Sequence, residues 1–331
     1  MPFLPPEKFS LVLTVFVSYL SLALPTLLLG IVVSSVLMVW TDESRWIGRL
    51  PRHRLLACLA GSGLGFLLPL GAVGVIPVVR RLLLQGAPLP GVIAFWIAAP
   101  TLNWATMLAT LNMLPAQPKL IFLRIALTWF MAIGLGLLFS LYGESPGLVN
   151  NSLALSGSPL LRSGTVVIRQ HHWNPLHRSG NLHYDADVKP LHLRPWQEKL
   201  RLFIDNVGDE SLEFGGILML TTAIAAGVMV YFPLAQFLLA AETAREQVVL
   251  MLGLGFFVPL EATFNVGFLV PYLETFWAGG LLAFLLLGSW LNLQTLGLSL
   301  ITFRLRPLLY LVVIVSQLTL VFAFLLNNYG K

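Results

Sequence analysis

The chain has 331 residues, of which 57% are hydrophobic and only 11% are charged, and its mean hydropathy is +0.82. Because a soluble domain carries roughly a quarter charged residues, this composition excludes a soluble enzyme, a nucleic-acid-binding protein and a disordered chain. Lipid must be the solvent for most of the surface. We therefore interpret the net charge of +5 as Lys and Arg retained in cytoplasmic loops.

Stretches without charged residues predict the membrane segments. A spanning helix needs roughly 20 apolar residues. Six spanning helices are predicted on this basis, at residues 11–40, 91–113, 120–142, 212–233, 278–300 and 307–327. The stretch 199–213, just before the fourth of them, has apolar residues at helical spacing, and we expect it to form an amphipathic helix on the membrane surface.

Two further apolar segments, 55–85 and 246–274, carry proline and glycine near their centres. Proline removes a backbone donor and clashes with the preceding turn of a helix. Neither segment is therefore expected to form one straight helix. Both are predicted to be discontinuous helices or re-entrant hairpins.

The two halves of the chain contain an internal repeat. Residues 68–106 align with residues 258–295, so that Pro69 pairs with Pro259 and Asn103 with Asn292. We predict an all-α polytopic membrane protein of about eight membrane segments, built from two inverted repeats. Each repeat would consist of a helix, a broken or re-entrant hairpin and two helices. The repeats would occupy residues 1–143 and 201–331, joined by a polar, histidine-containing cytoplasmic loop at 144–200.

The distribution of Lys and Arg favours this inverted arrangement. If the two broken segments span the membrane, the two sides receive nine and eleven cationic residues. If they are re-entrant, fifteen lie on one side and five on the other, as the positive-inside rule requires. The favoured topology has both termini outside and the central loop in the cytoplasm. It counts Arg80 and Arg81 with the cytoplasmic loops and Arg124 with an external loop.

Glu261 is the one ionisable residue within the apolar core of the second broken segment. A carboxylate in hydrocarbon is costly and by default functional, so Glu261 is a candidate for proton coupling or substrate binding. The alternative is a polar anchor where a hairpin tip meets water. Asn265 lies four residues on, where a helical tip would bring it beside Glu261.

Polar residues at matching places in the two repeats extend this candidate site. Asn103 and Asn292 either bind a substrate near the midplane, where the repeats meet, or hydrogen-bond one helix to another. Backbone groups freed by the prolines offer ligands for an ion or anion. The predicted substrate-binding and translocation residues are Glu261, Asn103, Asn292, Asn265, Thr101, Gln294, Pro69, Pro77 and Pro259.

The central loop contains five of the six histidines. Among them, His171, His172, His177 and His183 are candidate ligands of a transition metal. Their spacing lacks a His-x3-His register, which favours a polar linker instead. Catalytic and nucleotide-binding motifs are absent from the sequence, so we expect neither an enzyme nor a cofactor.

The stretch that begins at Pro69 resembles a known family, the predicted permeases that include the bacterial organoarsenical efflux permeases. The pattern that carries the resemblance comprises Pro69, Pro77, Gly86-x-Pro88, Phe95, Pro100 and Asn103. Many members have Cys-Ser-Cys after the first proline, where this chain has Gly71, Ala72 and Val73. The thiols that would bind a soft metalloid are thus absent. In the second half, a Glu-Ala-Asp-like stretch of the family corresponds to Glu261, Ala262 and Thr263.

The resemblance implies a membrane permease of the prokaryotic cytoplasmic membrane. We predict a secondary transporter that moves a small solute or ion by alternating access, in the efflux direction and with proton coupling through Glu261. The alternatives are a channel-like pore and a metal-handling or sensing module that acts through the histidine-rich loop. The expected partners are the lipid bilayer and the transported solute or ion, but no nucleic acid; a homo-oligomer stays open.

Overall fold

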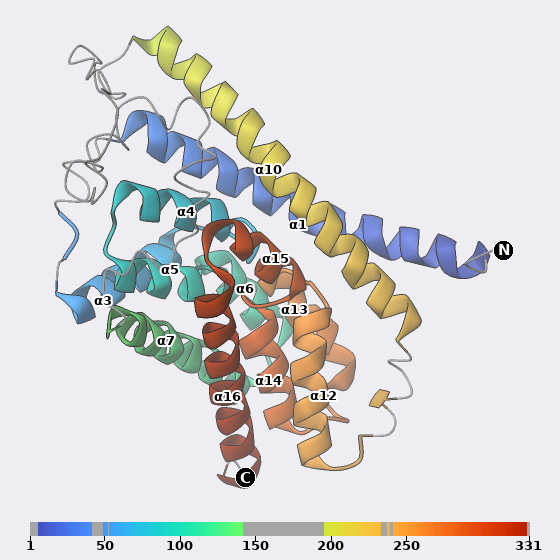
Figure 1. Ribbon diagram of the computed structural model, residues 1–331. Coiled ribbons are helices and arrows are strands. Elements are labelled where there is room, and N and C mark those ends of the chain that lie inside the picture. The colour runs from blue at the N-terminus through green and yellow to red at the C-terminus, as the bar shows by residue number, and fades with distance from the viewer. Residues whose placement is uncertain are drawn as a thin grey trace.

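The computed structural model describes residues 6–41, 49–51, 53–141, 195–232, 237–238 and 241–329. The regular structure of these residues is helical, which confirms the all-α prediction (Figure 1). Six of the described helices are long and apolar enough to cross a membrane. These candidate spans are Glu7–Trp40, Leu89–Met113, Pro118–Leu141, Trp196–Tyr231, Ala278–Thr302 and Leu305–Tyr329.

The helices form two successive series. The first series is α1 (Pro6–Trp40), α3 (Arg54–Leu67), α4 (Val75–Gln85), α5 (Leu89–Leu102), α6 (Trp104–Met113) and α7 (Pro118–Leu141). The second series is α10 (Trp196–Tyr231), α12 (Ala244–Phe257), α13 (Ala262–Leu269) with the 3-10 turn η2 (Val270–Tyr272), α14 (Ala278–Gly288), α15 (Leu293–Thr302) and α16 (Leu305–Tyr329).

The longest helices, α1 and α10, pack against each other. They have 35 and 36 residues, so each is roughly 50 Å long and exceeds the ~30 Å hydrocarbon core of a bilayer. Figure 1 shows them crossing along one side of the molecule, with the other helices on the opposite side. The stretch 199–213, expected to form a surface helix, is part of α10 and continues into the rest of that helix without a break. Its Asn206 and Glu210 are buried against polar side chains of α1 and α4.

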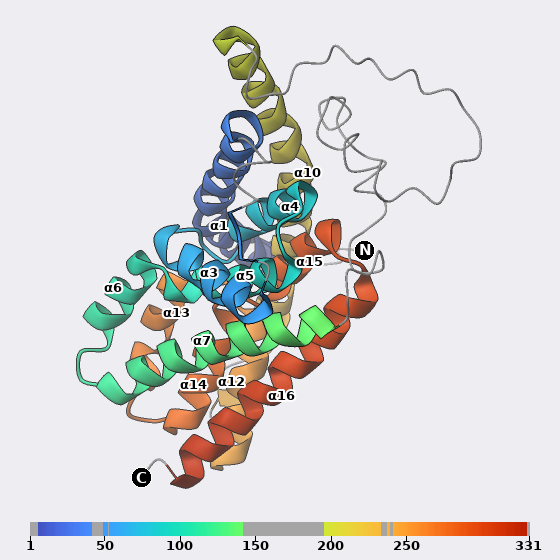
Figure 2. The same ribbon diagram turned by 90° about the vertical axis from the view of Figure 1, so that its left-hand side faces the viewer.

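Behind this crossed pair, each series forms a three-helix cluster. Helices α3, α5 and α7 pack on one another, and so do α12, α14 and α16 (Figure 2). The short helices connect the clusters, since α4 contacts α1, α5 and α15, while α13 contacts α5, α6 and α14. The side chains of Phe95, Trp96, Phe284 and Trp290 are fully buried in the shared apolar core.

Both proline-containing segments are broken, as predicted. Helix α3 ends at Leu67, two residues before Pro69, and α12 ends at Phe257, two residues before Pro259. Pro77 lies in the first turn of α4, where the missing N–H of proline costs least. The loops 68–74 and 258–261 therefore form two tips of non-helical backbone.

Two helices predicted to be continuous are also interrupted. The predicted span 91–113 is divided into α5 and α6 at Asn103, and the predicted span 278–300 into α14 and α15 at residues 289–292. The local reason is the asparagine at each break, which has an extended backbone and caps the helix that follows.

Candidate functional site

The two tips meet at Glu261. This residue is the N-cap of α13, but its side chain does not cap its own helix. One carboxylate oxygen, Oε2, accepts a hydrogen bond of 2.7 Å from the backbone N–H of Ala72 in the first tip. The other, Oε1, lies 2.7 Å from the hydroxyl of Thr26 on α1. Because the side chain is only 3% exposed, the carboxyl group is enclosed between elements of both series.

Glycines allow this close approach. A Cβ atom added to Gly71 would lie 2.1 Å from Oε2 of Glu261, inside van der Waals contact. A Cβ atom on Gly74 would lie 2.1 Å from the carbonyl oxygen of Thr26, and one on Gly30 would lie 1.9 Å from the carbonyl oxygen of Gly74. The first tip therefore packs backbone to backbone against α1 and leaves space for the carboxyl group.

Asn103 and Asn292 use their side chains close to the helix breaks. The Asn103 amide donates to the carbonyl oxygens of Ala99 and Pro100 at 2.7 and 3.0 Å, and its Oδ1 accepts from the N–H of Thr106 at 2.9 Å. Oδ1 of Asn292 accepts from the N–H of Thr295 at 3.0 Å. Both asparagines are buried. They hold the breaks of α5–α6 and α14–α15 in corresponding ways.

The remaining predicted polar residues are buried at separate places. Gln294 on α15 donates a hydrogen bond of 2.7 Å to the hydroxyl of Thr222 on α10. Thr101 on α5 has a buried hydroxyl group without a partner. Asn265, one turn after Glu261 on α13, is fully buried, and neither atom of its amide has a hydrogen-bond partner.

Arg124 is the functional candidate that the charge count missed. Its placement in an external loop is wrong, since it lies on α7 and is only 1% exposed. The guanidinium donates to three neutral oxygens: the Thr110 hydroxyl at 2.6 Å, the Ala262 carbonyl at 2.9 Å and the Ser289 hydroxyl at 3.0 Å. Its position inside the predicted span 120–142 was the available signal, because a charge in a spanning helix is expensive and usually functional.

The assignment of Arg80 and Arg81 to a cytoplasmic loop is also wrong. Both are buried on α4 and form ion pairs of 2.6 Å with α10, Arg80 with Glu213 and Arg81 with Glu210. Arg81 also donates to Oδ1 of Asn206 at 3.2 Å. Of these three arginines, two were counted among the fifteen cationic residues of the predicted cytoplasmic side and one among the five of the predicted external side. Without them, the excess of positive charge remains on the predicted cytoplasmic side.

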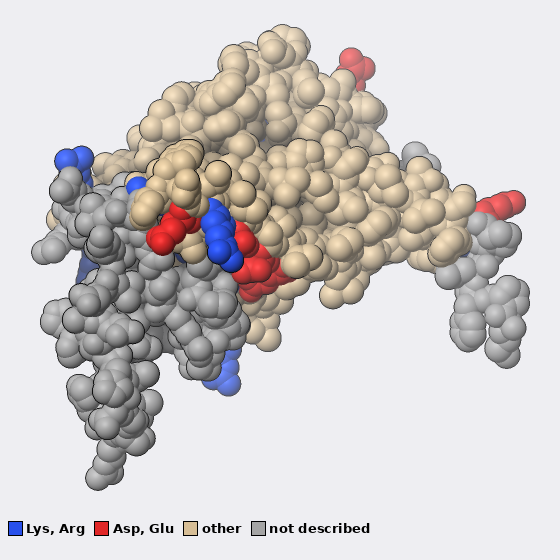
Figure 3. Space-filling view, turned by 90° about the horizontal axis from the view of Figure 1, so that it is seen from above, with Lys and Arg blue, Asp and Glu red and all other residues tan. Residues whose placement is uncertain are grey.

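The histidine candidates lie outside the described residues, as does the central loop from 144 to 194. Within the described ranges, no group of three or more His, Cys, Asp or Glu side chains is arranged to hold a metal ion. Seen from above, the described residues show few Lys, Arg, Asp and Glu side chains (Figure 3).

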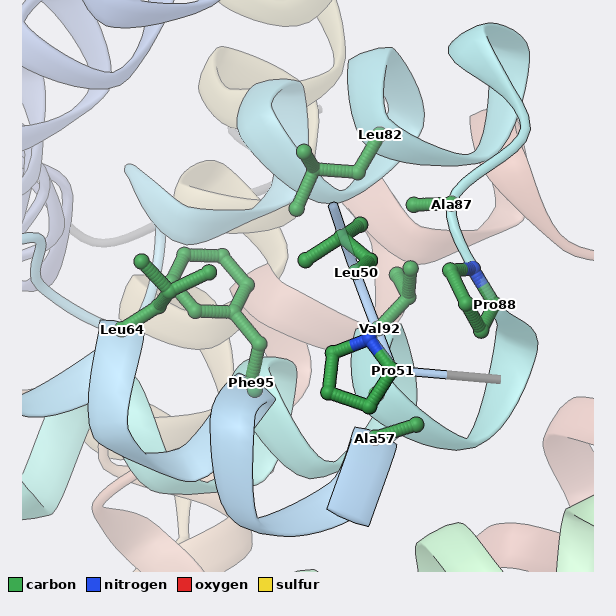
Figure 4. A pocket seen from close by; sticks show the side chains of 11 residues that line it. Leu50, Pro51, Ala57, Leu64, Leu82, Ala87, Pro88, Val92 and Phe95 are labelled. Carbon is green, nitrogen blue, oxygen red and sulfur yellow. The ribbon is translucent and has the colours of Figure 1, made fainter. Parts of the chain in front are cut away.

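A narrow apolar pocket lies among α3, α4 and α5, away from the tips. Leu64, Leu82, Val92 and Phe95 point into it in Figure 4, and none of the predicted site residues lines it. Its lining supplies no charged side chain that would orient a polar ligand. The pocket therefore does not extend the site around Glu261.

Comparisons with known proteins agree with a transport function. Residues 8–328 match a family described as "Predicted permease". The chain is 25% identical to the UPF0718 protein YcgR of Bacillus subtilis over 91% of this chain and 93% of that protein. It is 22% identical, over 95% of this chain and 94% of the relative, to a Streptococcus mutans protein named "Putative two-component membrane permease complex subunit". No solved structure gives a significant match.

Proposed function

Because the chain belongs to the predicted permease family and is a multi-pass integral membrane protein, we propose that it is a secondary transporter rather than an enzyme. It exports a small solute or ion across the bacterial cytoplasmic membrane by alternating access. The observation that carries this proposal is the enclosed Glu261 carboxyl group, which joins the two tips between the two series of helices.

The proposed architecture is a pair of inverted repeats. Each series contains three candidate spans, and an odd number of crossings gives the two series opposite orientations in the membrane. The short helices also correspond, since α3 and α12 both have 14 residues and α6 and α15 both have 10. Transporters with inverted repeats bind their substrates near the midplane at discontinuous helices, which supports a site at the two tips.

Proton coupling through Glu261 is supported by the hydrogen bonds of Thr26. The Thr26 hydroxyl group lies 2.8 Å from the carbonyl oxygen of Ala23 and 2.7 Å from Oε1 of Glu261. A hydroxyl group has one hydrogen, so it cannot donate to both oxygens fully. A protonated Glu261 removes this conflict, because the carboxyl group then donates to Thr26 and Thr26 donates to Ala23. The site thus accommodates a neutral carboxyl group. After proton release, Thr26 can donate to Glu261 only if it gives up its bond to Ala23, so a change in the protonation of Glu261 alters the hydrogen bonding of α1.

The test starts from a growth screen of overexpressing and deletion strains against metalloids, metals and small anions, which identifies a transported solute. The full-length protein is then reconstituted in liposomes that contain a pH-sensitive dye. We expect solute flux to drive proton movement in the wild type. Glu261→Gln, which keeps the shape but cannot release a proton, should abolish that movement.

Glu274→Gln is the matched control, because Glu274 is an exposed carboxylate shortly after α13. It should retain the wild-type proton movement. Unchanged pH-dependent flux in Glu261→Gln would contradict proton coupling. Currents of single-channel size in a planar bilayer would contradict alternating access and indicate a pore.

A further inference from the structure

We infer that Arg124 is the anchor of a binding site for a small oxyanion, so that the transported solute carries a carboxylate, phosphate or similar group. This inference deepens the proposed function and rests on it for the direction and route of transport.

Among the residues that the structure describes, no carboxylate forms an ion pair with Arg124, so its guanidinium brings an unpaired positive charge into the protein interior. Arginine remains protonated in proteins, and buried charges are normally paired. The hydrogen-bond partners of Arg124 are two hydroxyl groups and one carbonyl group. The described ion pairs use Arg80, Arg81 and Arg201 instead. Glu261 directly precedes Ala262, a partner of Arg124, but its carboxyl oxygens are directed at Ala72 and Thr26.

The surroundings of Arg124 match the expected position of a transported solute. Arg124 lies on α7 and reaches Thr110 on α6, Ala262 at the start of α13 and Ser289 at the end of α14. Four helices from both series therefore meet at one guanidinium. Ala262 directly follows the second tip, and Ser289 lies at the break between α14 and α15. Transporters of this architecture bind substrates at such non-helical places.

Unused hydrogen-bonding groups lie on Arg124 itself and on α13, one turn after its partner Ala262. The Nε atom of Arg124 is buried and has no partner. Asn265, on the next turn of α13 after Ala262, is 0% exposed, and both atoms of its amide are without a partner. Buried polar groups in proteins are normally hydrogen-bonded. The three bonds of Arg124 use three of the five N–H groups of a guanidinium. The Nε–H group therefore offers an oxyanion a charge-assisted hydrogen bond, and the amide of Asn265 supplies a further donor.

The experiment measures anion binding by the full-length protein in detergent. Sodium phosphate, sulfate and acetate are titrated at constant ionic strength against sodium chloride, and the Tm is followed by tryptophan fluorescence. We expect at least one oxyanion to raise the Tm saturably. Arg124→Gln should abolish this rise, and Arg124→Lys should reduce it, since the charge remains but the Nε–H donor is lost. Arg201→Gln, which changes an exposed arginine on α10, should leave the rise unchanged.

Asn265→Leu distinguishes binding from a structural role. Since the amide has no partner in the protein, its replacement by an apolar side chain of similar size should leave the Tm without oxyanion unchanged or higher. The half-saturating oxyanion concentration should rise about tenfold. This change corresponds to a loss of about 1.4 kcal/mol of binding free energy, as expected for one hydrogen bond. This variant keeps the inference testable if Arg124→Gln does not fold.

The outcomes separate this inference from the proposed function. If no oxyanion stabilises the wild type beyond chloride, or if Arg124→Gln lowers the Tm but retains the oxyanion-induced rise, Arg124 only holds the helices together and the inference is overturned. Solute flux that is insensitive to both Arg124→Gln and Asn265→Leu would overturn it too, while the permease remains a transporter. Binding that depends on Arg124 without flux in liposomes would support the inference and contradict secondary transport.

Discussion

Gly71→Ala is expected to break the contact between the two tips while it adds a single methyl group. The new Cβ atom would lie 2.1 Å from Oε2 of Glu261, which is more than ~1 Å inside normal contact. The carboxyl group must withdraw by a similar distance. Its 2.7 Å hydrogen bond to the N–H of Ala72 then exceeds the ~3.2 Å range of such bonds. The buried N–H of Ala72 is then left without a partner, which costs about 1–3 kcal/mol, so the Tm should fall by several degrees.

The assay compares the Tm and the solute-driven proton movement of Gly71→Ala with those of Gly63→Ala. Gly63 lies within α3 and has no atom within 4 Å of an added Cβ. Alanine should therefore be neutral there or stabilise the helix by up to ~1 kcal/mol. If Gly71→Ala kept the wild-type Tm and proton movement, the carboxyl group of Glu261 would not depend on its contact with the first tip. The reasoning about the tips would then be refuted.

Three further predictions address the ion pairs, the topology and the central loop. Arg81→Met should destabilise the protein by about 3–5 kcal/mol, because it leaves the Glu210 carboxylate buried and unpaired; Arg81→Met with Glu210→Met should recover most of the loss of Tm. In a cysteine-free background, Glu7→Cys should react with an impermeant maleimide from outside intact cells, whereas Arg49→Cys should react only after the cells are opened. Deletion of residues 165–195 should change flux modestly; complete loss would favour a metal-sensing role for the histidine-rich loop.

The membrane segments were predictable because their determinants are local. Apolar stretches reveal spanning helices through length and composition alone, and the prolines mark the places where α3 and α12 end. The breaks at Asn103 and Asn292 were not predictable in the same way. Asparagine does not interrupt a helix by itself, and its role became evident only from the bonds that Oδ1 forms with the N–H groups of Thr106 and Thr295.

Charged residues were harder to place than apolar ones. The charge count assigned Arg80, Arg81 and Arg124 to loops because each lies near the end of an apolar stretch. Their partners come from distant parts of the sequence: Glu213 and Glu210 for the first two, and carbonyl and hydroxyl groups of the second series for Arg124. Such pairings depend on how the two halves pack, which a linear count does not contain. The position of Glu261 within an apolar core, by contrast, was itself a sufficient signal of burial.

The geometry at Gly71 bears on the kind of solute that the tips accept. In the family that the sequence resembles, many members carry Cys-Ser-Cys at this tip, and thiolates prefer soft metals and metalloids. Here Gly71 has no side chain, and the carboxyl group of Glu261 occupies the space where one would project. A carboxyl group can take up a proton, and a backbone N–H donates hydrogen bonds to oxygen atoms, so neither group suits a soft metalloid. A cysteine at position 71 would displace Glu261 rather than add a thiol beside it, so the tip suits one kind of chemistry or the other.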